Sequence, residues 1–192
     1  SSNAYGLGHC GADWTACSRA TGPVVWWPEV DASPEHERQV RKMSELQELY
    51  QEIVMEHNRK PRNFRKLEDP NRSADGFNPF CGDMVSIYLK IDNDRITDIG
   101  FQGSGCAISR ASASLMTDSI KGKNTAEAKE LFDAFHRMIT RQPQSESDSG
   151  DLGDLEVLAG VSQFPTRIKC AVLSWHTLRG ALEGQDETVS TE

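Results

Sequence analysis

Residues 84–91, MVSIYLKI, alternate apolar with polar side chains. This alternation places one set of side chains on each face of a strand, so the stretch predicts a half-buried β-strand. Turn-forming residues follow at 92–94, and the stretch 95–102, RITDIGFQ, returns as the partner strand of a hairpin. The alternation slips between Ile96 and Ile99, which predicts a β-bulge in the returning strand.

Stretches with helical periodicity lie on both sides of this hairpin. Helices are predicted from Ser44 to about residue 60, after the GSG at 103–105, from about Thr125 to Ile139, over DLEVLAGV at 154–161, and after Pro165. Strands and helices do not alternate along the chain. We therefore predict an α+β domain with a small antiparallel sheet of about three strands and helices packed on one face.

The two ends of the chain lack this periodicity. Residues 1–42 mix glycine, proline, serine and charge, and their opening SSNA is typical of an expression tag. Since Met43 would be a natural start, we interpret 1–42 as a tag, a misassigned start or a disordered leader. The acidic stretch 184–192 is predicted to be a disordered tail. The expected folded domain is therefore residues 43–183.

Composition argues against two classes of partner. A net charge of −8 is unlike that of a nucleic-acid-binding protein, which normally has a basic surplus. No apolar run approaches the roughly 20 residues needed to span a bilayer. We therefore expect neither a nucleic-acid nor a membrane partner, and we place the protein in the reducing cytoplasm. There, cysteines are better interpreted as metal ligands, catalytic thiols or core residues than as disulfides.

Three of the five cysteines lie at predicted element boundaries. Cys81 begins a strand, Cys106 opens a helix, and Cys170 lies in the first turns of the last helix. A helix start favours the thiolate, which is the form that binds metal or attacks sulfur. Asp83 lies two positions after Cys81, so along a strand the two side chains project to the same face. Three thiolates and one carboxylate could fill a tetrahedral zinc site, although spacing alone leaves three buried structural cysteines as an open alternative.

The motifs around these cysteines are specific. FNPFCGD at 77–83, GSGCAISRASASLMT at 103–117 and FPTRIKCAVLSWHTL at 164–178 each contain one cysteine. Their order resembles the SufU/IscU/NifU-N family of iron–sulfur cluster assembly proteins, over about residues 44–183. The resemblance implies an α+β fold with a small antiparallel sheet, and a metal site made by Cys81, Asp83, Cys106 and Cys170.

Two features resemble the SufU branch of that family. Lys169 stands where the IscU-type scaffold has a histidine, and the polar region at 141–158 is similar to an insertion of the SufU branch. The resemblance implies a zinc-dependent sulfurtransferase that serves a SufS-type cysteine desulfurase and downstream cluster-assembly proteins. Cys81 would accept the sulfur and Arg167 would support the site. The alternative is a non-catalytic scaffold that assembles a [2Fe–2S] cluster on the same ligands.

Two further features carry weaker expectations. The basic run at 58–66, NRKPRNFRK, follows His57 in an otherwise acidic chain. We interpret it as a solvated helix end and loop, with a docking surface for an acidic partner as the alternative. His176 follows the inward-facing Trp175 and is expected to be solvated or partner-facing rather than a metal ligand.

Overall fold

The computed structural model describes residues 34–140, 152–184 and 188–191. The described elements are, in chain order, α1 (Pro34–Arg59), β1 (Arg72–Asn78), β2 (Asp83–Asp92), β3 (Arg95–Ser104), α2 (Ala107–Ile120), α3 (Thr125–Thr140), the 3-10 helix η1 (Gly153–Gln163), α4 (Pro165–Glu183) and β4 (Val189–Ser190). None of the described helices is long and apolar enough to cross a membrane. Contacts divide the chain into Ser1–Val40 and Arg41–Glu192, and all candidate site residues lie in the second unit.

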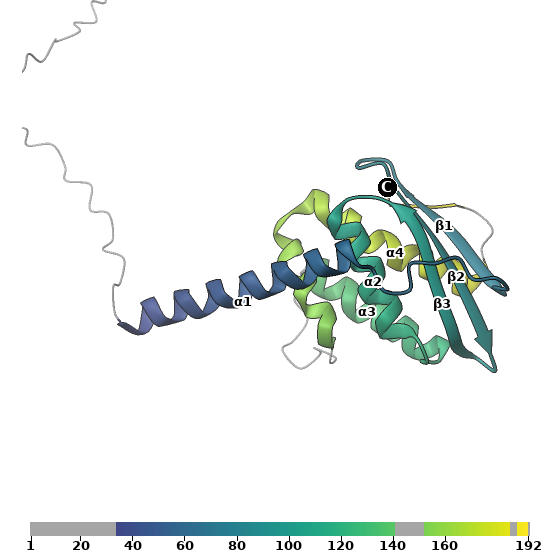
Figure 1. The fold of residues 1–192 in the computed structure, drawn as a ribbon, viewed down its shortest axis with the longest axis horizontal. Coiled ribbons are helices and arrows are strands. Elements are labelled where there is room, and N and C mark those ends of the chain that lie inside the picture. The colour runs from purple at the N-terminus through teal and green to yellow at the C-terminus, as the bar shows by residue number, and fades with distance from the viewer. Residues whose placement is uncertain (1–33, 141–151, 185–187, 192) are drawn as a thin grey trace, which may run out of the picture. The chain divides into compact units, whose positions relative to one another are not determined.

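The sheet confirms the predicted α+β class. Its strand order is β3-β2-β1-β4, in which β1, β2 and β3 are antiparallel and β4 runs parallel to β1. Helices α2 and α4 lie on one face of the sheet (Figure 1). Helices α3 and η1 pack against those helices rather than against the strands.

The predicted β-bulge is confirmed in β3. Ile91 pairs with Ile96, whereas the preceding residue, Lys90, pairs with Asp98. Thr97 is therefore the extra residue on the returning strand. The bulge restores the inward phase, so both isoleucines of β3 are fully buried.

One part of the expected C-terminal tail is a strand. Val189 pairs with Gly76 and Ser190 pairs with Phe77, which adds β4 to the edge of the sheet. An edge strand offers unpaired backbone N–H and C=O groups, so a short segment can join it without an apolar pattern of its own. Composition alone therefore could not indicate this pairing.

Helix α1 begins ten residues before the predicted start at Ser44. The stretch 34–43, PEHERQVRKM, opens with a proline and is rich in glutamate, arginine, glutamine and lysine. Proline is favoured at the first helical position, and these long side chains have high helix propensity. The predicted helix start at Ser44 is therefore wrong, because the helix is already established there.

Helix α4 lies directly on β1, and this packing positions the site. A Cβ atom on Gly76 would come 2.0 Å from Thr177 Oγ1, so only glycine allows the strand and the helix to approach so closely. Two residues before Thr177, the Trp175 ring stacks on Phe135 of α3 with centroids 4.5 Å apart. Cys170 lies seven residues before Thr177, about two helical turns nearer the end of β1 where the next connection begins.

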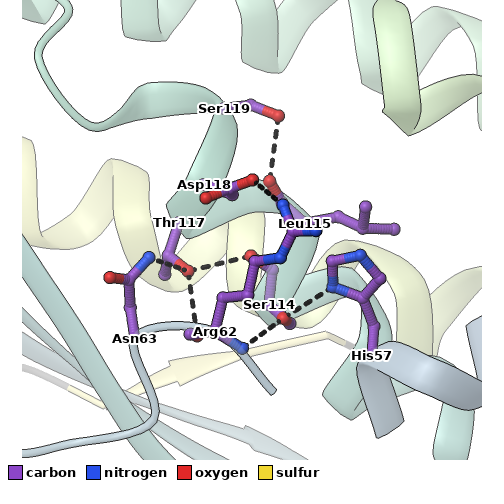
Figure 2. Close-up of polar contacts among 8 residues, drawn as sticks. All are labelled: His57, Arg62, Asn63, Ser114, Leu115, Thr117, Asp118 and Ser119. Atoms are coloured by element: carbon purple, nitrogen blue, oxygen red, sulfur yellow. Dashed lines mark hydrogen bonds and ion pairs between the residues drawn. The ribbon is translucent and has the colours of Figure 1, made fainter. Parts of the chain in front are cut away.

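The basic run is anchored to α2 rather than fully solvated (Figure 2). His57 is buried, and its Nδ1 lies 2.8 Å from Ser114 Oγ, which also accepts a hydrogen bond from the Arg62 backbone N–H at 2.8 Å. The Arg62 guanidinium forms an ion pair with Asp118. Burial lowers the pKa of His57 below its ordinary value. The interpretation of this region as a solvated helix end is therefore wrong for His57.

His176 is also less solvated than expected. It is half-buried between α3 and α4, with its ring centroid 5.4 Å from Phe132 and 5.9 Å from His136. Burial, together with the nearby charges of His136 and Arg179, lowers the pKa of His176 to about 4. At neutral pH the imidazole is therefore uncharged, and it contributes to aromatic packing between the two helices.

Candidate metal centre

Cys81 lies in the tight turn at 79–82 that joins β1 to β2, and it is exposed there. Gly82 has a φ of +69°, in the left-handed region that favours glycine, and its N–H donates to Asn78 O at 2.8 Å. The Asn78 side chain also orders the turn, because its Oδ1 accepts from the Phe80 N–H at 3.1 Å. Strand β2 begins at Asp83, so Cys81 lies in the exposed connection that leads into the strand.

Cys170 meets Cys81 from the first turns of α4. The two Sγ atoms lie 3.2 Å apart, and both thiols are free. Cys170 is fully buried and its Sγ accepts a hydrogen bond from Asn78 Nδ2 at 3.5 Å. Burial raises the pKa of Cys170, and the neighbouring Cys81 and Asp83 raise it further. Two thiolates could coexist at this spacing only with a cation beside them.

Asp83 places a carboxylate next to these sulfurs. It is the first residue of β2 and is only 1% exposed. Its Oδ1 accepts from the Cys106 backbone N–H at 2.9 Å, and Gly105 permits this approach because a Cβ there would lie 2.9 Å from the same oxygen. The other oxygen, Oδ2, is buried and has no hydrogen-bond partner among the described residues. A buried carboxylate oxygen without a partner is costly, and a bound cation would satisfy it.

The three side chains form a group that fits a metal ion. The ligand atoms of Cys81, Asp83 and Cys170 all lie within 4.8 Å of one another. Thiolate and carboxylate are both ligands that zinc takes in proteins. The carboxylate that lacks a partner and the crowded sulfurs are two independent indications of a missing positive charge.

Cys106 lies at the edge of this group. It is the N-cap of α2, as its predicted place at a helix start requires, and its Sγ accepts from the Ser109 N–H at 3.5 Å. Its sulfur is not among the three ligand atoms that lie within 4.8 Å of one another. It is nevertheless near, because its charge contributes to the raised pKa of Cys170. The structure therefore brings three of the four predicted ligands together and holds the fourth beside them.

Arg167 is an exposed residue in the first turn of α4. The negative charges of Cys106 and then of Cys170 raise its pKa above the ordinary value for arginine. Its guanidinium is therefore close enough to the cysteine group to interact with charge there. This position is compatible with the supporting role that the sequence predicts for it.

Two features of the site escaped sequence reasoning. Asn78 is fully buried and bonds both the turn and Cys170, yet it has no charge or sulfur to mark it. Lys169 extends over the Phe80 ring, with Nζ 3.8 Å from the ring centroid. The available signal for Asn78 was its place immediately before Pro79 in the first cysteine motif.

Asp83→Asn should weaken metal binding without disturbing the turn. The amide keeps the shape and an oxygen that can accept from the Cys106 N–H, but it removes the negative charge. Altering a residue that merely supports a ligand costs roughly 10–100-fold in metal affinity, so losing a ligand should cost at least as much. A competition titration with a chromophoric zinc chelator measures the change. Asp92→Asn, at the exposed far end of the same strand, is the matched control, and equal affinity in the two variants would exclude Asp83 as a ligand.

Comparisons with known proteins agree with this geometry. A family model described as the NifU-like N terminal domain matches residues 49–171. The chain is 47% identical over 133 residues to the zinc-dependent sulfurtransferase SufU of Bacillus subtilis, which covers 69% of this chain and 88% of that protein. It is 43% identical over 141 residues to the iron-sulfur cluster assembly scaffold protein IscU of Streptococcus pyogenes, with 73% and 87% covered.

Solved structures share the fold. A crystal structure from Fervidobacterium islandicum AW-1, described as an iron-sulfur cluster assembly scaffold protein for the SUF system, has 35% sequence identity and a TM-score of 0.64. The match covers 68% of this chain and 94% of that one. Relatives named for a scaffold and relatives named for a sulfurtransferase are therefore similarly close.

Proposed function

Because this chain belongs to the NifU-like N-terminal domain family of iron–sulfur cluster assembly proteins, we propose that it is a zinc-dependent sulfur acceptor of the SufU kind. The observation that carries the proposal is the contrast between two adjacent thiols. Cys81 is exposed in a turn, whereas Cys170, with its Sγ 3.2 Å away, is fully buried. Only the exposed thiol can meet a sulfur atom carried by another protein.

Zinc would be held by Cys81, Asp83, Cys106 and Cys170. The bound ion would keep the thiols deprotonated near neutral pH and would add no redox chemistry of its own. The fit rests on the unpartnered Asp83 Oδ2 and on the 3.2 Å separation of the Cys81 and Cys170 sulfurs. Cys106 would complete the set by turning its sulfur away from the weak bond to the Ser109 N–H.

The proposed reaction is a sulfur transfer between cysteines. The Cys81 thiolate attacks the terminal sulfur of a persulfide on a SufS-type cysteine desulfurase. A sulfur–sulfur bond forms on Cys81 as the bond in the donor breaks, and the desulfurase cysteine leaves as a thiolate. Sulfur changes its carrier and no external oxidant or reductant is needed. Arg167, exposed beside the thiols, provides a positive charge near the persulfide anion formed on Cys81.

The transferred sulfur would then go to proteins that build the cluster. A reducing cytoplasm suits this site, since two free sulfurs 3.2 Å apart would be oxidised readily in a disulfide-forming compartment.

The second candidate is a scaffold that assembles a [2Fe–2S] cluster on the same ligands. Its support is the 43% identity to a relative named as a scaffold, together with the sulfur-rich donor set. Lys169 favours the sulfur acceptor instead. Its ammonium has no lone pair to offer a metal at neutral pH, and its side chain is directed over Phe80.

Metal analysis of the full chain, purified without oxygen, tests the proposal against this alternative. We expect about one zinc per chain and little iron or inorganic sulfide, as a single tetrahedral site requires. Brown protein with the absorption of an iron–sulfur cluster and matching iron and sulfide would favour the scaffold. Chain expressed with iron and cysteine in excess provides the control, because low iron there cannot be ascribed to supply.

A further inference from the structure

An exposed aromatic side chain connects the Cys81 turn to α4. Phe80 is 68% exposed, yet its ring lies beneath the Lys169 side chain, with Nζ 3.8 Å from the ring centroid. A cation over the face of an aromatic ring within about 6 Å is attracted by the ring's quadrupole. Phe80 immediately precedes Cys81, and Lys169 immediately precedes Cys170. The contact therefore joins the neighbours of the two thiols.

We propose that Phe80 and Lys169 are positioning residues that form a latch, which holds the Cys81 thiol beside Cys170 and Asp83. The inference rests on the proposed function in one respect: sulfur acceptance is what Cys81 would do once the latch opens. The holding itself is a property of the turn and can be measured without sulfur transfer.

The two backbone N–H bonds of the turn cannot replace this contact. The Gly82 N–H donates to Asn78 O, and the Phe80 N–H donates to Asn78 Oδ1. Both bonds close the turn on itself and neither reaches α4. Closed in this way, the turn behaves as a small unit whose position over α4 depends on side-chain contacts with the helix. These are the Phe80–Lys169 pair, the weak bond from Asn78 Nδ2 to Cys170 Sγ at 3.5 Å and the contact of the two thiols.

The latch has the strength expected of a reversible contact. A cation–π pair at an exposed site corresponds to roughly a two- to fivefold change in an equilibrium. With the pair formed, Cys81 Sγ stays 3.2 Å from Cys170 Sγ, within the candidate metal group. With the pair broken, the turn can carry the thiol outward as a unit. A partner that takes up the exposed Phe80 ring would therefore also release Cys81.

The test is the rate at which iodoacetamide alkylates Cys81 in the full chain as purified, located by mass spectrometry. Phe80→Leu keeps an apolar side chain but removes the ring face, so Cys81 should react about two to five times faster. Phe77→Leu is the matched control, because Phe77 is an exposed phenylalanine of the same hairpin. Equal rates in the two variants would overturn the latch.

A double-mutant cycle separates the latch from the charge of the lysine. Lys169→Met removes a positive charge near the thiol whatever the state of the ring, and this effect is the same in both backgrounds. The Lys169→Met substitution should accelerate alkylation of Cys81 more in the native chain than in the Phe80→Leu background. In that background the ring contact is already lost, so only the charge effect remains. Equal effects in both backgrounds would overturn the proposal.

Cys170 serves as an internal control for folding, since it is fully buried in the native chain. Alkylation confined to Cys81 in Phe80→Leu supports local release of the turn. If Cys170 also reacts, the latch is tested instead with Phe80→Trp, whose ring face attracts the Lys169 ammonium more strongly. That variant should react no faster than the native chain, and faster alkylation of Cys81 would contradict the latch. All these outcomes stand whether or not the chain accepts sulfur from a desulfurase.

Discussion

Cys81→Ser should abolish sulfur acceptance from a cysteine desulfurase while leaving the domain folded. The serine hydroxyl is a poor nucleophile toward sulfur and cannot carry a persulfide. The exposed turn should tolerate the change, because the Cys81 side chain fills no space in the core. Alanine formation by the desulfurase with cysteine as substrate measures the loss, which should bring the rate back to that of the desulfurase alone.

Mass spectrometry locates the acceptor in the native chain. After reaction with desulfurase and cysteine, one additional sulfur atom should be found on the peptide that contains Cys81. Cys10→Ser, which changes a cysteine outside the three motifs, should leave the stimulation intact. A persulfide found chiefly on Cys106 or Cys170 would reverse the assignment, even with the family membership unchanged.

The strands that could be predicted were those with an apolar pattern. β2 and β3 alternate clearly, and even the bulge at Thr97 is encoded by a slip in that alternation. β1 was missed because its inward positions are Ala74, Gly76 and Asn78, which have no apolar signature. Gly76 is required by the close approach of α4, and this requirement becomes visible only when the helix is in place.

The candidate site could also be predicted only in part. Local sequence predicts that Cys106 opens a helix. Its placement of Cys81 and Asp83 on one strand face is wrong, because Cys81 lies in the turn before β2 and only Asp83 lies in the strand. The meeting of Cys170 with Cys81 depends on how α4 crosses β1, and periodicity does not encode that crossing. Contacts across 89 or more residues, such as those of Cys170 with Cys81 and with Asn78, need the folded chain. Only the resemblance of the three motifs indicated in advance that these cysteines would converge.

Removal of the metal should lower the melting temperature by roughly 10 °C or more. The candidate ligands come from separate segments, so one ion would tie the β1–β2 hairpin to α4 and, through Cys106, to the start of α2. An ion that binds only the folded chain adds its binding free energy to the free energy of unfolding. A loss of several kcal/mol gives a shift of this size, since 1 kcal/mol corresponds to roughly 2–4 °C in domains of 150–250 residues. Without the ion, the buried Asp83 Oδ2 and the crowded thiols lose their compensating charge.

Differential scanning calorimetry before and after chelation, with zinc loss verified by metal analysis, measures this shift. Returning one equivalent of zinc should restore the original melting temperature, which separates metal loss from chelator damage. Asp83→Asn should show a smaller shift on chelation than the native chain, because its site binds the ion more weakly from the outset. An unchanged melt after verified zinc loss would mean that the hairpin and α4 are held together by packing alone, such as the contact of Gly76 with Thr177. The ion would then serve the chemistry of Cys81 and not the fold.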